Sequence, residues 1–215
     1  MIRIEAGALL FDLDGTLVDS DAVVDRMWAR WADEVGLDHE GFRHTVYGRR
    51  GHEVMAQLLP GRPSERNLAD NQRMLAWEIE DTDGVVPIAG ARELLARLEP
   101  ARWAIVTSGT MALAAARIRA AGIPMPEFLV TAEQVVEGKP APEGFLRGAE
   151  LLGVVAGRCV AFEDSAAGLE AVRAAGMTAI AVGARPVEAR LAARVGDLTG
   201  IDVVTTGDGL ILTIG

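Results

Sequence analysis

The stretch Leu9-Leu10-Phe11-Asp12-Leu13-Asp14-Gly15-Thr16-Leu17 joins an apolar run to two acids that stand two residues apart. Residues 8–11 are typical of a buried β-strand, which ends at Asp12. An unpaired buried carboxylate destabilises the fold by several kcal/mol or shifts its own pKa, so these acids need a partner. A divalent cation bound through oxygen is the usual partner. A plain strand that runs into an Asp-Gly turn is the alternative.

The composition limits what the chain can be. It has 215 residues, of which 50% are apolar, which is enough for one core or for a core and a small accessory domain. The net charge of −10 argues against nucleic acid as a partner. We find neither a signal-peptide pattern nor an apolar run of membrane-spanning length, so we expect a cytoplasmic protein away from membranes. The one cysteine, Cys159, stands in an apolar run and is expected in the core.

Two scarce residue types carry information. The histidines are confined to residues 39–52, which excludes a Ser-His-Asp site or a multi-histidine metal site elsewhere. Lys139 is the only lysine among 21 basic residues, and it lies in the motif Gly138-Lys139-Pro140. Because every other residue of the Lys and Arg class is an arginine, a lysine at this position indicates that a compact ammonium is needed there. The alternative is that this single lysine is present by chance and has no special role.

Between Leu17 and Asp83 the pattern is helical, without a strand signal. We expect helices at 20–35, 40–46, 53–59 and 64–80. The loop 47–52 carries two glycines and three cationic or potentially cationic side chains. This block looks like an insertion.

From Gly84 onward, strands alternate with helices. We expect strands at 103–107, 128–131, 158–162, 178–182 and 202–204, and helices at 89–98, 111–121, 142–152, 166–175 and 186–194. Such alternation predicts a parallel sheet covered on both faces, a doubly wound, Rossmann-like α/β fold. We therefore expect an α/β core domain of residues 1–16 and 84–215, with residues 17–83 inserted as a small all-helical cap domain.

Ligands of such sheets bind at the carboxyl ends of the strands. Residues that end strands, or that precede a long helix, supply acids, hydroxyls and the single lysine: Asp12, Asp14, Thr107, Ser108, Gly109, Lys139, Glu163 and Asp164. Acids from two strand ends can hold Mg²⁺, and a Thr-Ser-Gly turn at a helix N-terminus suits a phosphoryl group. Each motif alone has a plain structural explanation, but all four on one face indicate a phosphate site.

Four segments resemble the motifs of the haloacid dehalogenase superfamily in order and context. They are Asp12-Leu13-Asp14-Gly15-Thr16, Thr107-Ser108, Lys139-Pro140 and Glu163-Asp164. The resemblance covers essentially the whole chain, and the helical insert is similar to that of the subclass with a small helical cap. Residues 103–110, 136–140 and 162–168 look closest to bacterial sugar phosphatases and to yeast-type glycerol-phosphate and deoxyglucose-phosphate phosphatases.

The resemblance implies a Mg²⁺-dependent phosphatase that acts on small phosphorylated sugars or polyols through an aspartyl phosphate. Asp12 would attack phosphorus and also bind the metal. Asp14 would protonate the leaving alkoxide and then activate water, while its backbone carbonyl binds the metal. Asp164 would bind Mg²⁺, with Glu163 assisting directly or through water.

The other motif residues would hold the phosphate. The resemblance gives this role to the Thr107 hydroxyl and the Ser108 N–H, in the turn that includes Gly109, and makes Lys139 the partner of Asp12 and the phosphate. The partner we expect is a small phosphate ester, bound by a monomer or weak dimer.

The cap is expected to select the substrate. Its loop matches the family's specificity loop, and within it Arg50 is our first candidate, with Arg49 or His52 as alternatives. Asp19, in the first hinge, is a further candidate. The alternative is that both arginines are ordinary solvated side chains of a surface loop.

Three other activities fit the same motifs less well. A phosphoglucomutase-like transferase shares them and would use cap arginines for a second phosphate. A dehalogenase would not need the metal, so Asp14 and Asp164 count against it. A non-enzymatic domain on this fold would not need the complete motif set.

Overall fold

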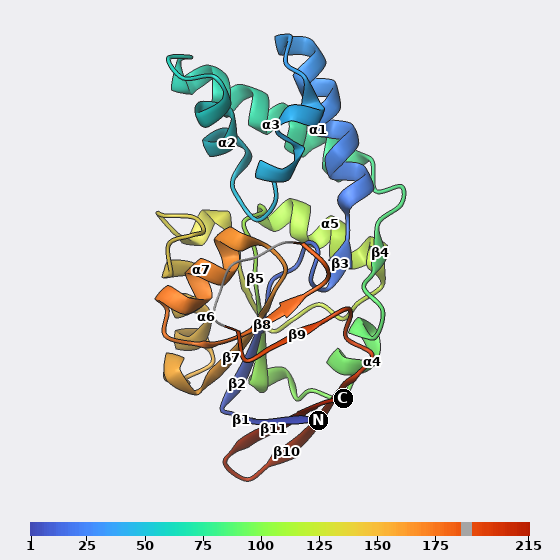
Figure 1. Cartoon of the computed structure of the whole chain (residues 1–215), viewed down its shortest axis with the longest axis vertical. Coiled ribbons are helices and arrows are strands. Elements are labelled where there is room, and N and C mark those ends of the chain that lie inside the picture. The colour runs from blue at the N-terminus through green and yellow to red at the C-terminus, as the bar shows by residue number, and fades with distance from the viewer. Residues whose placement is uncertain (186–190) are drawn as a thin grey trace.

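The computed structural model describes residues 1–185 and 191–215, and its centre is a six-stranded parallel sheet (Figure 1). The strand order is β6-β5-β2-β7-β8-β9. From edge to edge the strands are β6 (Phe128–Val130), β5 (Trp103–Val106), β2 (Ala8–Phe11), β7 (Cys159–Glu163), β8 (Thr178–Val182) and β9 (Ala193–Val195). The predicted doubly wound α/β fold is confirmed, with the first apolar run as a central strand.

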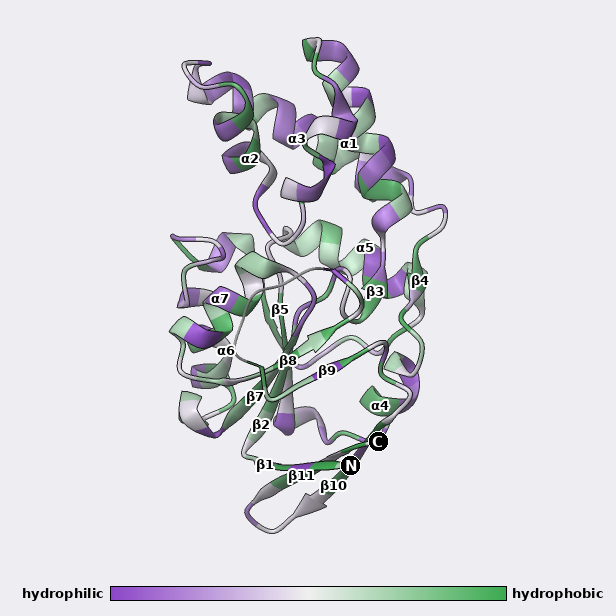
Figure 2. Ribbon diagram, in the orientation of Figure 1, coloured by the Kyte–Doolittle hydropathy of each residue, from purple (hydrophilic) through white to green (hydrophobic). Residues whose placement is uncertain are grey.

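Alternating side chains of β2 divide the core into two layers, and all four residues of this strand are fully buried. Leu9 and Phe11 face the layer that holds α4 and α5, whereas Ala8 and Leu10 face α6 and α7. Figure 2 shows the resulting concentration of hydrophobic residues along the central strands. A parallel sheet covered on both faces needs such continuous apolar strands.

Four α-helices follow strands or loops of this sheet. They are α4 (Ala91–Leu95), α5 (Met111–Ala121), α6 (Glu143–Leu151) and α7 (Ala166–Ala174). Side chains cap two of them, because the hydroxyls of Thr110 and Ser165 accept backbone N–H groups at the starts of α5 and α7. Short 3₁₀ turns lie at Pro100–Arg102, Ala132–Gln134 and Ala156–Arg158.

The end of the chain differs from the expectation. The strand predicted at 202–204 is part of β10 (Ile201–Thr206), which pairs antiparallel with β11 (Gly209–Ile214), and β11 pairs with β1 (Ile2–Ala6). This separate sheet lies beside both termini, away from the parallel sheet's carboxyl ends (Figure 1). The strand itself is confirmed, but its place in the parallel sheet is wrong, because a short β-branched run does not reveal whether its partner is parallel or antiparallel.

The helix predicted at 186–194 is also wrong in its last part. Residues 186–190 lie outside the described residues, and Ala193–Val195 forms β9 instead, parallel to β8. Alanine and arginine are good helix formers, but intrinsic propensity is a weak determinant, and pairing with the edge of β8 overrides it here.

Helices α1 (Asp21–Val35), α2 (Gly51–Leu58) and α3 (Ser64–Glu80) stand together beyond the carboxyl ends of the sheet (Figure 1). Two strands, β3 (Val18–Asp19) and β4 (Val86–Pro87), pair antiparallel where the chain enters and leaves this group. No strand was predicted at 18–19, and a two-residue strand gives no periodic signal. The helix predicted at 40–46 is instead two 3₁₀ turns, His39–Gly41 and Arg43–Thr45.

An aromatic cluster forms the interior of this helical group. Trp28, Trp31 and Phe42 meet edge to face, with ring centroids 5.4–6.3 Å apart. The indole N–H of Trp31 donates to Asp70 at 3.0 Å, and Arg62 donates to the same carboxylate at 2.6 Å. Among the described residues, none of the helices combines the length and apolarity needed to cross a lipid bilayer.

The buried carboxylate of Asp70 allows a test of this interior. Asp70→Ala leaves two donors unpaired, so we expect it to lower the free energy of unfolding by about 1–3 kcal/mol. The control is Asp33→Ala, an exposed acid on α1. Urea denaturation measures both, and equal effects would contradict the role of Asp70.

The same contribution has a defined pH dependence. Burial alone would raise the pKa of Asp70, but the hydrogen bonds from Trp31 and Arg62 lower it. The stabilisation is therefore complete above the unfolded-state pKa of about 3.9 and is lost as the pH falls through the lower folded-state pKa. The difference between wild type and Asp70→Ala should shrink over that acidic range.

Candidate active site

The predicted site residues converge at the carboxyl ends of three adjacent strands. Asp12 follows β2, Thr107 follows β5, and Glu163 ends β7, with Asp164 next. The register pairs Phe11 with Ile105 on one side and with Phe162 on the other, so these strand ends are level. The Phe11 and Phe162 rings stack with centroids 4.8 Å apart, directly before the acids.

Lys139 joins two of these strand ends. Its ammonium lies 2.5 Å from Asp12 Oδ1 and 2.6 Å from Glu163 Oε1. All three side chains are at most 5% exposed. The loop between β6 and α6 therefore delivers the only lysine of the chain to the buried carboxylates that need a cation.

The charges in this group perturb one another. Burial raises the pKa of Asp12 to about 7, opposed by the Lys139 charge and reinforced by the Glu163 and Asp14 carboxylates. Burial alone would lower the pKa of Lys139, but the Asp12 and Glu163 carboxylates raise it above its ordinary value. The Lys139 ammonium therefore stays charged. A further positive charge near Asp12 would stabilise its carboxylate form, because burial still raises its pKa.

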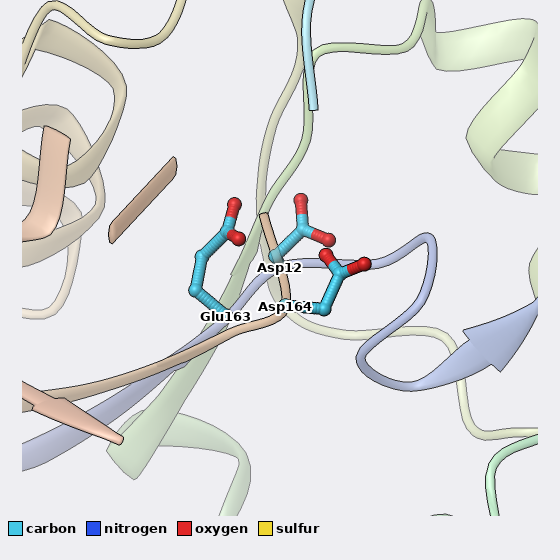
Figure 3. Close-up of side chains that lie close together, drawn as sticks. All are labelled: Asp12, Glu163 and Asp164. Atoms are coloured by element: carbon cyan, nitrogen blue, oxygen red, sulfur yellow. The ribbon is translucent and has the colours of Figure 1, made fainter. Parts of the chain in front are cut away.

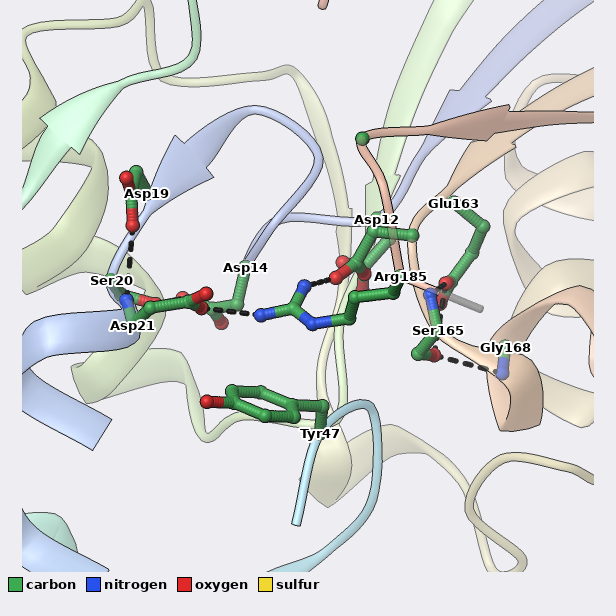
Figure 4. Close-up of polar contacts among 12 residues, drawn as sticks. Asp12, Asp14, Asp19, Ser20, Asp21, Tyr47, Glu163, Ser165, Gly168 and Arg185 are labelled. Carbon is green, nitrogen blue, oxygen red and sulfur yellow. Dashed lines mark hydrogen bonds and ion pairs between the residues drawn. The ribbon is translucent and has the colours of Figure 1, made fainter. Parts of the chain in front are cut away.

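Glu163 is fixed from the other side by the start of α7. Its Oε2 accepts the Ser165 N–H at 2.7 Å and the Ser165 hydroxyl at 3.0 Å (Figure 4). A carboxylate at a helix N-terminus is also favoured by the helix dipole. Gly168 makes this possible, because a Cβ there would collide with the Glu163 carboxylate.

Asp12, Glu163 and Asp164 form an acidic group whose oxygens lie within 4.8 Å of one another (Figure 3). Three buried carboxylates with oxygen donors alone are a donor set that suits a hard divalent cation. Asp164 Oδ2 is buried and makes no hydrogen bond within the described residues, although the Arg185 guanidinium lies against it as an ion partner. These residues therefore fit the Mg²⁺ site that the sequence predicts.

Arg185 also reaches this group, which the sequence did not predict. Its guanidinium contacts Asp164 Oδ2 and lies 2.5 Å from Asp21 Oδ1 at the start of α1 (Figure 4). It also stacks over the Tyr47 ring, 4.0 Å from the centroid. Arg185 thus links a predicted metal ligand to the helical group.

The predicted phosphate-binding turn lies beside Asp12. The Thr107 hydroxyl is buried and accepts the Gly109 N–H at 3.0 Å. The Ser108 hydroxyl donates to the Gly48 carbonyl at 3.0 Å, so it contacts the loop above. Thr110, rather than Thr107 or Ser108, caps α5. Residues 107–109 line the cavity described next.

A cavity of about 340 Å³ lies between the strand ends and the helical group. Its floor includes Asp12, Asp14 and Thr107. The helical group contributes Trp28 and a set of polar residues, which are Asp21, Tyr47, Arg49, Arg50, His52, Asn71, Gln72 and Glu78. This volume suits a small-molecule ligand.

The candidates in the helical group have different surroundings. Arg50 donates to three backbone carbonyls of the loop before Lys139, those of Ala132, Val135 and Val136, at 2.8–3.1 Å. Arg49 donates to Gln57 at 2.6 Å. These two arginines and His52 line the cavity.

Asp19 lies elsewhere. It is exposed and accepts the Asp21 N–H at 3.1 Å, and it is not among the described residues that line the cavity.

Asp14 stands at the cavity floor, 27% exposed. Its Oδ1 accepts the Ser20 hydroxyl at 2.8 Å and lies 2.6 Å from Nη1 of Arg117. Arg117, on α5, also contacts Glu78 of α3. Neither residue was expected at the site from the sequence, although a signal existed. Each falls on the apolar side of its helix, Arg117 three residues after Ala114 and Glu78 four after Met74.

Comparisons with known proteins identify the family. Residues 6–176 match the model of the haloacid dehalogenase-like hydrolases. The chain is 43% identical over 177 residues to hexitol phosphatase A of Escherichia coli, covering 81% of this chain and 82% of that protein. It is 34% identical over 209 residues to 2-deoxyglucose-6-phosphate phosphatase 1 of Saccharomyces cerevisiae, covering 85% and 81%.

The fold comparison agrees. The crystal structure of CbbY from Rhodobacter sphaeroides in complex with phosphate superposes with a TM-score of 0.75 at 26% identity, covering 90% of this chain and 95% of that one. The chain belongs to the haloacid dehalogenase-like hydrolases. It is an enzyme, a phosphoric monoester hydrolase of this family.

Gly168 offers a test of how Glu163 is held. We expect Gly168→Ala to push the Glu163 carboxylate away from Lys139 and to lower kcat/KM by at least about 10-fold, since small displacements in active sites are costly. The control is Gly196→Ala, where a Cβ meets no heavy atom within 4 Å. If steady-state kinetics give both variants wild-type values, the Glu163 position does not matter for turnover.

Proposed function

We propose that this enzyme is a Mg²⁺-dependent phosphatase of small phosphorylated sugars or polyols, which acts through an aspartyl phosphate on Asp12. The observation that carries the proposal is the group formed by Asp12, Lys139 and the Thr107 turn at the cavity floor, with Asp14 beside them. It combines a nucleophile, a cation, phosphate-binding donors and a second carboxylate for proton transfer.

In the first step, an Asp12 oxygen attacks phosphorus, and the bond from phosphorus to the ester oxygen breaks. The leaving oxygen takes a proton from Asp14 and departs as an alcohol. The Thr107 hydroxyl and the Ser108 N–H bind the phosphoryl oxygens, in the turn that includes Gly109, and Lys139 compensates their charge.

In the second step, Asp14 accepts a proton from water as that water attacks phosphorus. Inorganic phosphate leaves and the Asp12 carboxylate is restored. Splitting the hydrolysis into two steps lets the same residues stabilise each transition state.

The acidic group would hold the cation through Asp12, Asp164, the Asp14 backbone carbonyl and Glu163. A bound Mg²⁺ supplies positive charge for the phosphoryl oxygens. Its charge would also stabilise the carboxylate form of Asp12, whose pKa is raised by burial despite the contact with Lys139.

We further propose that residues 17–83 form a cap domain over a core of residues 1–16 and 84–215, with β3 and β4 as its hinge. Closure would exclude bulk water from the cavity. His52, Asn71 and Gln72 line the side of the cavity contributed by the helices and offer hydrogen bonds to hydroxyl groups. The names of the relatives, a hexitol phosphatase and a deoxyglucose-phosphate phosphatase, support this substrate class.

A mutase remains the second candidate because it needs the same floor. It must also hold a second phosphate, and the two cap arginines were the expected residues for it. Arg50 gives its bonds to the loop before Lys139, and Arg49 gives one to Gln57. The three bonds of Arg50 leave at most one of the two arginines for a second phosphate, which favours hydrolysis.

Phosphate release tests the proposal directly. We expect hydrolysis of hexitol, hexose and glycerol monophosphates with Mg²⁺, and loss of turnover after treatment with a chelator. Asp12→Asn removes the nucleophile and should lower kcat by about 10³-fold or more. Wild-type turnover by this variant would contradict the covalent mechanism, and full activity with excess chelator would contradict the metal.

A second measurement separates hydrolysis from transfer. Phosphate should be released from a hexose monophosphate at the same rate with and without an added hexose bisphosphate. A requirement for the bisphosphate, with conversion of one monophosphate isomer into another, would identify the mutase instead.

A further inference from the structure

Arg117 is a buried arginine that no motif explains. It lies on α5, its side chain is 4% exposed, and its guanidinium lies between two carboxylates from different parts of the chain. Nη1 is 2.6 Å from Asp14 Oδ1, and Nη2 contacts Oε2 of Glu78 on α3. Burying a guanidinium is costly, and these two acids offset that cost.

The contact with Arg117 constrains one half of the Asp14 carboxylate. Oδ1 is held by Arg117 and by the Ser20 hydroxyl at 2.8 Å. Oδ2 has no hydrogen-bond partner among the described residues, and Asp14 lines the cavity. Two donors on one oxygen fix the rotation of the carboxylate and leave the other oxygen free to exchange a proton with a ligand.

Glu78 brings α3 into this arrangement. It lies near the end of α3, just before the segment that leads to β4, and it is 8% exposed. Burial raises its pKa, against the lowering effect of the Arg117 charge. The contact between Glu78 and Arg117 requires α3 to lie against α5, as it does here. Because the Arg117 guanidinium contacts Glu78 as well as Asp14, its positive charge is divided between the two carboxylates.

We infer that Arg117 is a positioning residue that aligns Asp14 with the leaving group. Through its contact with Glu78, it also makes this alignment depend on the position of α3 against α5. The inference rests on the proposed function, in which Asp14 protonates the leaving oxygen. Arg117 itself transfers no proton and touches no reacting atom. Its effect is on where Asp14 Oδ2 stands when the ester bond breaks.

Substrates with different leaving groups separate this role from a structural one. An alkyl phosphate such as glycerol phosphate needs a proton on its leaving oxygen, whereas p-nitrophenyl phosphate releases p-nitrophenolate, a stable anion that needs none. The ratio kcat/KM reports only the steps up to formation of the aspartyl phosphate. It therefore compares proton donation in the two substrates without the later hydrolysis.

We expect Arg117→Met to lower kcat/KM by about 100-fold on glycerol phosphate, within the range of general acid catalysis. On p-nitrophenyl phosphate the loss should stay below about 5-fold. Arg117→Lys, which keeps the charge and can reach one carboxylate, should recover much of the loss. The matched control is Arg119→Met, which removes an exposed charge from the same helix and should behave like wild type.

A fold control accompanies the variants. Arg117→Met leaves Glu78 buried and unpaired, so the double variant Arg117→Met/Glu78→Gln removes that charge as well. Thermal unfolding shows whether each variant is folded, and if the single variant is not, the double variant carries the test. Glu78→Gln alone should give a smaller loss with the same preference for the aryl ester.

Equal losses on both esters in a folded variant would overturn the inference, as would wild-type kinetics for Arg117→Met. Asp12→Asn in the same assay distinguishes the two proposals. If Asp12→Asn is inactive while Arg117→Met shows no leaving-group preference, only the role of Arg117 fails. If Asp12→Asn turns over normally, the proposed function itself fails.

Discussion

The arrangement of the site depends on one buried ammonium between two carboxylates. Lys139 is within 2.6 Å of both Asp12 and Glu163, which come from adjacent strands. Without this cation, two like charges would face each other in a region nearly closed to water. Glu163 is in turn fixed by the first residues of α7. One ammonium with two ion contacts thus aligns the end of β2, the end of β7, the start of α7 and the loop before α6.

The same pattern recurs twice around this centre. Arg117 is shared by Asp14 and Glu78, and Arg185 is shared by Asp164 and Asp21. In each pair, one acid belongs to the strand-end motifs and the other to a helix above them. Three cations therefore face six carboxylates, and the excess of negative charge matches the Mg²⁺ that we propose. Lys139 and Arg117 nevertheless give a chain with a net charge of −10 positive groups at the strand ends.

The sequence predicted the parts of the fold that depend on local pattern. The β2 strand was visible because it is apolar on both faces, and α1 was visible because its apolar residues recur at helical spacing. The chain end was not predictable in the same way, because pairing of β10 with β11, and of β9 with β8, depends on distant edges.

The site divides along similar lines. Sequence motifs indicate the acids and the Thr107 turn, and the scarcity of lysine draws attention to Lys139. Arg117 and Arg185 carry no motif, and their partners lie far away in the chain. The guanidinium of Arg50 could be expected in the loop, but not its bonds to the carbonyls at 132–136, since backbone acceptors leave no mark in a sequence.

The burial of Lys139 has a consequence for the chemistry of the whole surface. It is the only lysine of the chain and is 6% exposed, and the other basic side chains of the Lys and Arg class are arginines. The folded enzyme therefore presents essentially no lysine amine to acylating reagents, to reducing sugars or to enzymes that attach groups to lysine. Only unfolding brings that amine into solvent. Covalent labelling of a single lysine would then count the molecules whose active site has come apart.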